Sequence, residues 1–223
     1  MNISAQLPDR PDQGMLQKKG GRGFPHCIFM DENGEVLIEA RPSDEDSFKS
    51  ASRPITLLFA MRKEASTAKR SAKKTAEQNL SLIEAVVNPK PEEFKKLNKL
   101  AKKKKLDKEI RALYQMTVKT WPAREAMEKA NAAIAKATSR DEYQAAGQKR
   151  DEAMYDLFKK KFRIEKEDMP YFDDFWMGVA QHAVVASDKK NGLAAIEKLE
   201  KKYKGNQRYM NYFRGIRTKL EAL

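Results

Sequence analysis

Apolar side chains recur at helical spacing through most of the chain after Pro54. The clearest series is Met61, Ala65, Ala68, Ala72, Ala76, Leu80, Ile83 and Val87. Steps of three or four residues place these side chains in one narrow stripe along a helix. Pro54 suits a first helical turn, and no proline or glycine follows it before Asn88. The pattern therefore predicts one long helix over residues 54–87.

The stripe is rich in alanine, so it lets a second helix approach closely. Since an isolated helix gains little stability in water, we expect this close neighbour to be either a later helix of the chain or a second copy of the chain. A homo-oligomer formed through the stripe is thus one expectation. Ala72→Glu, in the middle of the stripe, should cost about 1–3 kcal/mol by burying an unpaired charge. Lys73→Glu, one position round the helix, should cost almost nothing.

More helices are predicted toward the C-terminus. Pro122 should interrupt the pattern, and Ser139 with Glu142 has the spacing of a capping box. The last three helices each carry an apolar face, and short turns join them, so we expect them to stack as antiparallel neighbours. Their arrangement resembles a tetratricopeptide-type (TPR-like) array, although no repeat of about 34 residues occurs. The predicted helices span residues 91–104, 106–120, 122–138, 140–162, 170–187, 189–203 and 206–222.

A β-hairpin is predicted before the helices. Residues 26–31 and 35–40 read as short strands, and Asn33-Gly34 between them is a strong tight-turn signal. Two strands alone are marginal in water, so the hairpin needs a third strand, a helix or a partner. After it, Pro42-Ser43 should start a helix, with Ser43 and Asp46 in capping-box spacing.

The residues around this hairpin resemble the second half of a thioredoxin-like domain. Gly20–Pro25 reads GGRGFP, the next six residues read HCIFMD, and an Asn-Gly turn leads into the second strand. The resemblance covers about residues 8–52. It implies that Pro25 is the cis-proline of that family and that Phe24, Pro25 and His26 border a peptide-binding groove. A structural turn is the other interpretation of Pro25, and we favour it.

The resemblance is incomplete because the family's CxxC helix and first strands have no counterpart in the chain. The single cysteine, Cys27, allows neither an internal disulfide nor a CxxC pair. Cys27 also neighbours His26 on a strand, so their side chains point to opposite faces and do not share a metal. With two histidines in all, we expect no catalytic constellation, no metal site and no cofactor.

Charge adds a second candidate site. The net charge is +13, and residues 61–111 hold 16 basic against 7 acidic side chains. Such a field attracts nucleic acid or an anionic surface, or it is only the solvated face of a helix end. No arginine and aromatic residues alternate there to stack on bases. The candidate anion-binding patch consists of Lys99, Lys102, Lys103, Lys104 and Lys105.

Together these features predict a mainly α protein. A thioredoxin-like segment with a short β-hairpin (residues 1–52) precedes a helical domain (residues 53–223) built as an antiparallel bundle or a TPR-like array. Within the helical domain, residues 54–111 form the basic long-helix part and residues 112–223 the stacked amphipathic helices.

The leading function hypothesis is a non-catalytic protein that acts through protein–protein interaction. One alternative is the C-terminal part of a thioredoxin-family thiol-disulfide oxidoreductase whose CxxC lies upstream of Met1. The other is a basic nucleic-acid-binding protein. The chain contains no run of about 18 apolar residues, so we expect no membrane-spanning helix. If Met1 is the true start, we expect a cytoplasmic location; with a truncated start, the location is open.

Overall fold

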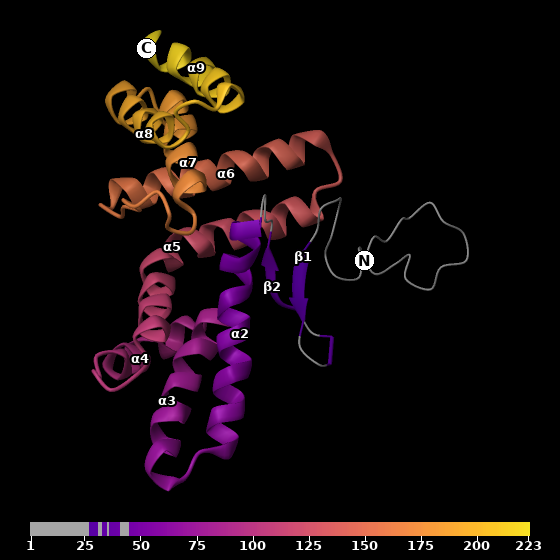
Figure 1. Ribbon diagram of the computed structural model, residues 1–223. Helices are drawn as coiled ribbons and strands as arrows, with labels where there is room; N and C mark the ends of the chain where they lie inside the picture. Colours follow the sequence, from indigo (N-terminus) through magenta and orange to yellow (C-terminus); the bar gives the residue numbers. More distant parts are fainter. Residues whose placement is uncertain (1–26, 31–32, 35, 41–44) are drawn as a thin grey trace. The chain divides into compact units, whose positions relative to one another are not determined.

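The computed structural model describes residues 27–30, 33–34, 36–40 and 45–223. It is mainly helical, with a short antiparallel sheet of two strands in the described part. The chain forms two compact units, Met1–Thr117 and Val118–Leu223, here called the first and second units. Their boundary falls inside one long helix (Figure 1). No helix among the described residues is long and apolar enough to cross a membrane.

The predicted β-hairpin is present. Strand β1 (Cys27–Met30) pairs antiparallel with β2 (Val36–Ala40), and Phe29 lies opposite Ile38. Gly34 has a φ of 77°, a left-handed conformation that favours glycine in the turn. Support comes from helix α2 (Glu45–Thr67), whose Phe48 ring lies 5.6 Å from the Phe29 ring. The predicted helix start at Pro42-Ser43 lies outside the described residues.

The prediction of one helix over residues 54–87 is wrong. The chain forms α2 and then α3 (Arg70–Val87), which lie side by side as a helical hairpin (Figure 1). Lys69 interrupts the helix with an extended backbone, although no proline or glycine marks the place. Two short helices can bury their apolar faces against each other, whereas one long helix would leave the stripe in water.

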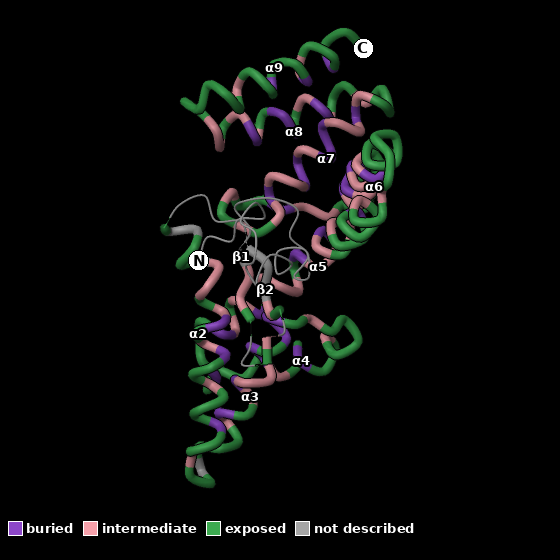
Figure 2. Tube along the Cα trace, turned by 90° about the vertical axis from the view of Figure 1, so that its right-hand side faces the viewer, coloured by how far each residue is buried: buried purple, intermediate pink, exposed green. Residues whose placement is uncertain are grey.

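The hairpin changes the interpretation of the alanine stripe. Ala65 on α2 and Ala76 on α3 are buried, whereas Ala72, next to the turn, is exposed. Ala72 was expected at the centre of a buried stripe, so that expectation is wrong too. The close neighbour of the alanines is the other arm of the hairpin (Figure 2). The stripe is therefore no continuous face on which a second copy of the chain could dock.

The first unit continues through a short 3-10 turn, η1 (Pro91–Glu93), into α4 (Phe94–Ala101). Helix α5 (Lys108–Lys136) follows and runs on into the second unit. The Tyr114 hydroxyl of α5 donates a hydrogen bond of 3.3 Å to the Phe94 carbonyl, and the two rings meet edge to face. Arg53 and Glu109 add an exposed, two-bond ion pair between α2 and α5.

Proline interrupts the helices less than the sequence indicates. The predicted helices 106–120 and 122–138 are one helix, α5, with Pro122 inside it. Helix α2 likewise contains Pro54, which was expected at a helix start. In α5 the buried residues Thr120 and Ala123 lie on either side of the proline. Packing at these positions offsets the one backbone hydrogen bond that proline removes.

The second unit holds four successive helices. They are α6 (Arg140–Lys159), α7 (Phe172–Val185), α8 (Lys189–Lys202) and α9 (Gln207–Glu221). The three apolar faces predicted for residues 172–220 all belong to one hydrophobic core, so that prediction is confirmed. Trp176 is central: it is 2% exposed, and its indole N–H donates to the Ile164 carbonyl at 2.7 Å. Ser139 caps α6, as its spacing with Glu142 predicts.

Candidate functional site

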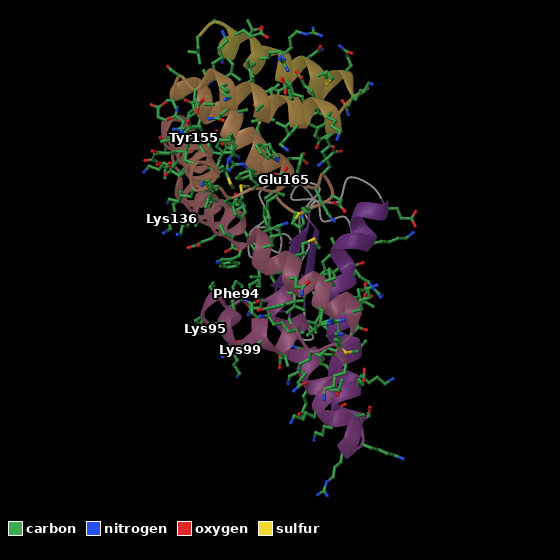
Figure 3. The ribbon with its side chains drawn as sticks, turned by 90° about the vertical axis from the view of Figure 1, so that its left-hand side faces the viewer. Phe94, Lys95, Lys99, Lys136, Tyr155 and Glu165 are labelled. Atoms are coloured by element: carbon green, nitrogen blue, oxygen red, sulfur yellow. The ribbon has the colours of Figure 1, made fainter. Side chains whose placement is uncertain are left out.

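The two predicted sites have different outcomes. Phe24, Pro25 and His26 lie outside the described residues, so the peptide-groove hypothesis remains a prediction. Lys99 lies in the last turn of α4, and Figure 3 shows it with Lys95 on that helix. Helix α4 ends at Ala101, earlier than the predicted residue 104, so the run Lys102–Lys105 forms the loop between α4 and α5. All five lysines of the predicted patch are exposed.

This lysine loop is held at its C-terminal end. Leu106 is 3% exposed and anchors the loop in the first unit. The N–H of Asp107 donates to the Asn79 side-chain oxygen of α3 at 3.0 Å, and Asn79 is itself buried. The Asp107 carboxylate in turn accepts from the N–H of Ile110, at 2.9 Å, in the first turn of α5. These bonds connect the loop to α3 and α5 and keep its lysines on the surface.

Beside the loop, the first unit has an open groove of about 850 Å³, here called the lysine-rimmed groove. Helices α2, α3 and α4 supply most of its walls. Its floor is aliphatic, and Leu58, Val87 and Leu97 in it are almost fully buried. The apolar residues that line it are Leu37, Leu58, Ala85, Val87, Leu97 and Leu100.

The rim of the groove is cationic. Five basic side chains line it, against two acidic ones, Glu84 and Glu93. Arg62 lies 5.9 Å from the ring centroid of Phe59. The four lysines of the rim are exposed, and among the described residues none of them forms an ion pair. The groove thus presents unneutralised positive charge around an apolar floor. The five basic residues are Arg62, Lys90, Lys96, Lys99 and Lys103.

The wall formed by α3 adds an unused hydrogen-bond acceptor. The side-chain oxygen of Gln78 is shielded from solvent and has no hydrogen-bond partner in the part of the chain that the structure describes. An unpaired buried acceptor costs about 1–3 kcal/mol, so a ligand that donates to it gains a corresponding advantage. The groove therefore combines an apolar floor and positive charge with one unpaired acceptor in its wall.

Sequence reasoning found part of this site. Lys99 and Lys103 of the predicted patch line the groove, whereas Lys102, Lys104 and Lys105 do not. Lys96, which was not placed in the patch, precedes Lys99 by three positions on α4, so a face-by-face reading of that helix could have added it. Arg62, Gln78 and Lys90 come from other segments. No local signal marks Arg62 and Gln78, because only the packing of α2 against α3 brings them to α4. Lys90 lies directly before η1 and carries no signal beyond its charge.

No family model matches the chain, and neither the curated proteins nor the solved structures contain a significant match. The geometry of the groove therefore supplies the basis for a proposed function.

Proposed function

We propose that the protein is a non-catalytic, mainly helical interaction protein, and that its lysine-rimmed groove binds an acidic amphipathic segment of a partner protein. The observation that carries this proposal is a set of exposed lysines that form no ion pair with any described residue and surround an aliphatic floor. The thioredoxin-like segment and the TPR-like array expected from the sequence are part of the same proposal, as scaffolds for interaction.

An amphipathic helix suits the groove on two counts. Its apolar side chains, at positions i, i+3, i+4 and i+7, would contact the floor near Leu58, Leu97 and Leu100. Its flanking carboxylates would then reach the rim lysines. Pairing at the surface contributes only about 0.2–1 kcal/mol for each ion pair, so the floor provides most of the affinity and the rim most of the selectivity.

An acidic protein is favoured over a nucleic acid by the groove's composition. Single-stranded nucleic acids bind through aromatic platforms as well as cations, and none of the described residues that line this groove is aromatic. Leucine, valine and alanine side chains match the apolar face of a helix instead. The loop residues Lys102, Lys104 and Lys105 extend the positive surface past the groove, which suits a ligand longer than a small molecule.

The experiment is fluorescence anisotropy with the full chain and a labelled 16-residue helical peptide. The peptide carries leucine at i, i+3, i+4 and i+7 and glutamate at most other positions. We expect binding that weakens with added salt. A peptide with lysine in place of glutamate should not bind. Equal binding of the two peptides would refute the proposal.

Two matched variants test the location of binding. Lys96 lines the groove and Lys95, its neighbour on α4, does not, yet both lysines are exposed. Lys96→Glu should weaken peptide binding about 3- to 10-fold, whereas Lys95→Glu should change it less than twofold. The reverse order, or an equal loss in both variants, would remove the groove from the proposal. Tighter binding of a 20-nucleotide single strand than of the acidic peptide would favour the nucleic-acid hypothesis instead.

A further inference from the structure

The second unit has a groove of its own, of about 800 Å³, lined by α6, α7 and α9. Part of its wall is apolar and exposed: Val185 is 76% exposed and Tyr212 is 52% exposed. Ile216 beside them is almost buried and belongs to the core of the unit. The groove thus places an apolar surface in solvent directly over a well-packed core, as a binding surface does.

A buried carboxylate also lines this groove. Asp151 on α6 is 7% exposed, and one of its oxygens, Oδ1, accepts both hydrogen bonds from Arg150, at 2.9 and 2.7 Å. Its second oxygen has no hydrogen-bond partner among the described residues. Burial raises the pKa of Asp151, and the Arg150 guanidinium opposes that rise. Arg150 thus binds the carboxylate through one oxygen, and the other oxygen remains able to accept a hydrogen bond from a ligand.

Close packing holds Asp151 in place. A Cβ atom built on Gly178 of α7 would lie 3.3 Å from the Asp151 Cα and 2.8 Å from the Met154 Cβ, so α6 and α7 approach each other closely here. Glu152, the next residue, also lines the groove and is exposed. The carboxylate of Asp151 is therefore presented by a closely packed helix pair, and Glu152 lines the same groove from the next position of α6.

The remaining wall is rich in amide groups. Gln181 donates a hydrogen bond of 2.7 Å to the Tyr212 hydroxyl, which leaves the hydrogen of that hydroxyl to donate elsewhere. Asn211 uses its side-chain oxygen for Gln207, and its NH₂ group has no acceptor in the described part of the chain. Amides and hydroxyls of this kind pair with the backbone of an extended peptide. Lys219 on α9 adds a further donor for the carbonyl groups of such a peptide.

We infer that this groove is a second binding site, and that it takes a polypeptide segment in which an arginine follows an apolar residue. The guanidinium would donate to the second oxygen of Asp151, and the apolar side chain would cover Val185 and Tyr212. Arginine is favoured over lysine because its guanidinium is more weakly hydrated than an ammonium group and so suits an ion pair beside an apolar surface. The site lies wholly within the second unit, so it is separate from the lysine-rimmed groove and requires a partner of opposite charge.

The test is an NMR titration of the full chain, labelled with ¹⁵N, with the capped dipeptide acetyl-Leu-Arg-amide. The reference probe is acetyl-Leu-citrulline-amide, in which a neutral urea replaces the guanidinium. We expect chemical-shift changes concentrated at Val185, Tyr212 and Gly215. The citrulline probe should bind at least about fivefold more weakly than the arginine probe. Equal affinity for both probes, or shifts spread away from the groove, would overturn the inference.

Variants complete the test. Asp151→Asn should abolish the preference for arginine over citrulline. If that variant folds poorly, Gly215→Met tests the site independently. Gly215 lines the groove, and a Cβ built on it meets no atom within 4 Å. The methionine side chain should therefore fill the groove without disturbing α9. Gly215→Met should abolish binding of both probes, and Thr218→Met, on the same helix but outside the groove, should not. Undiminished binding by Gly215→Met would overturn the inference. Lys96→Glu in the first unit should leave dipeptide binding unchanged, which separates this result from the proposed function.

Discussion

Replacing Ala76 by glutamate should destabilise the α2–α3 hairpin strongly, whereas the same replacement at Ala72 should be tolerated. Ala76 is fully buried on α3, and Ala72, one helical turn earlier, is exposed. A single uninterrupted helix would place both alanines in the same stripe, so it predicts equal losses. The comparison therefore tests the hairpin directly, with the same new side chain in the same helix.

The magnitude follows from burial. A glutamate at position 76 must either keep its charge in an apolar contact or bind a proton there, and an unpaired polar group costs about 1–3 kcal/mol. Forcing the longer side chain between α2 and α3 adds about 1–3 kcal/mol of overpacking. The expected loss is thus about 2–6 kcal/mol, a large share of the stability of a typical domain. At position 72 the carboxylate stays in water, and the change should be within about 0.5 kcal/mol.

The assay must report on the first unit. Both tryptophans, Trp121 and Trp176, belong to the second unit, so their fluorescence does not follow the hairpin. Hydrogen exchange measured by mass spectrometry on peptides from α2 and α3 does. Ala76→Glu should lower protection there by about thirtyfold or more, since about 1.4 kcal/mol corresponds to a factor of ten. Equal protection from hydrogen exchange in the Ala72 and Ala76 variants would refute the helical hairpin of α2 and α3.

Two further predictions concern the second unit. Gly192→Ala should destabilise it by about 1–3 kcal/mol in urea titrations followed by tryptophan fluorescence, because the new Cβ would lie 2.9 Å from the Ala183 Cβ and collide with Leu220. Gly215→Ala, with open space around the new Cβ, should instead stabilise the unit by about 0.5–1 kcal/mol. The opposite order of stabilities would contradict the packing of α7, α8 and α9. Burial, the 2.5 Å hydrogen bond to Asp188 and the charge of Asp188 raise the pKa of Tyr155 to about 12. An unfolded tyrosine ionises near pH 10, so between about pH 10 and 12 the unfolded state loses a proton that the folded state keeps. The free energy of unfolding should therefore fall over this range, and less steeply in Tyr155→Phe. An unchanged pH dependence in that variant would argue against the raised pKa.

Local patterns were sufficient for much of the fold. The tight turn at Asn33-Gly34, the cap at Ser139 and the apolar faces of the last three helices all match the structure. Each of these features depends on residues within a few positions of one another. A cap satisfies the free N–H groups of its own helix, and an apolar face needs only helical spacing to form. Such features hold in almost any tertiary context.

The interruptions of the helices depended on tertiary structure. Lys69 has no sequence feature of a helix break, yet the chain turns there; Pro122 has one, yet α5 continues through it. Relative to alanine, an ordinary residue in a helix costs up to about 0.7 kcal/mol and a proline about 3 kcal/mol. Burying several apolar side chains outweighs either value. Where a helix ends is therefore decided by which surfaces it can cover.

The candidate site shows the same division. The sequence by itself established a positively charged region and identified Lys99 and Lys103 in it. Only the packing of α2 against α3 brings Arg62 and Gln78 to the same groove, from positions up to about 40 residues away along the chain. Charge and helical spacing are properties of residues and their near neighbours, so sequence reveals them. A groove exists only between helices, because its floor and rim are surfaces that separate segments share after they pack.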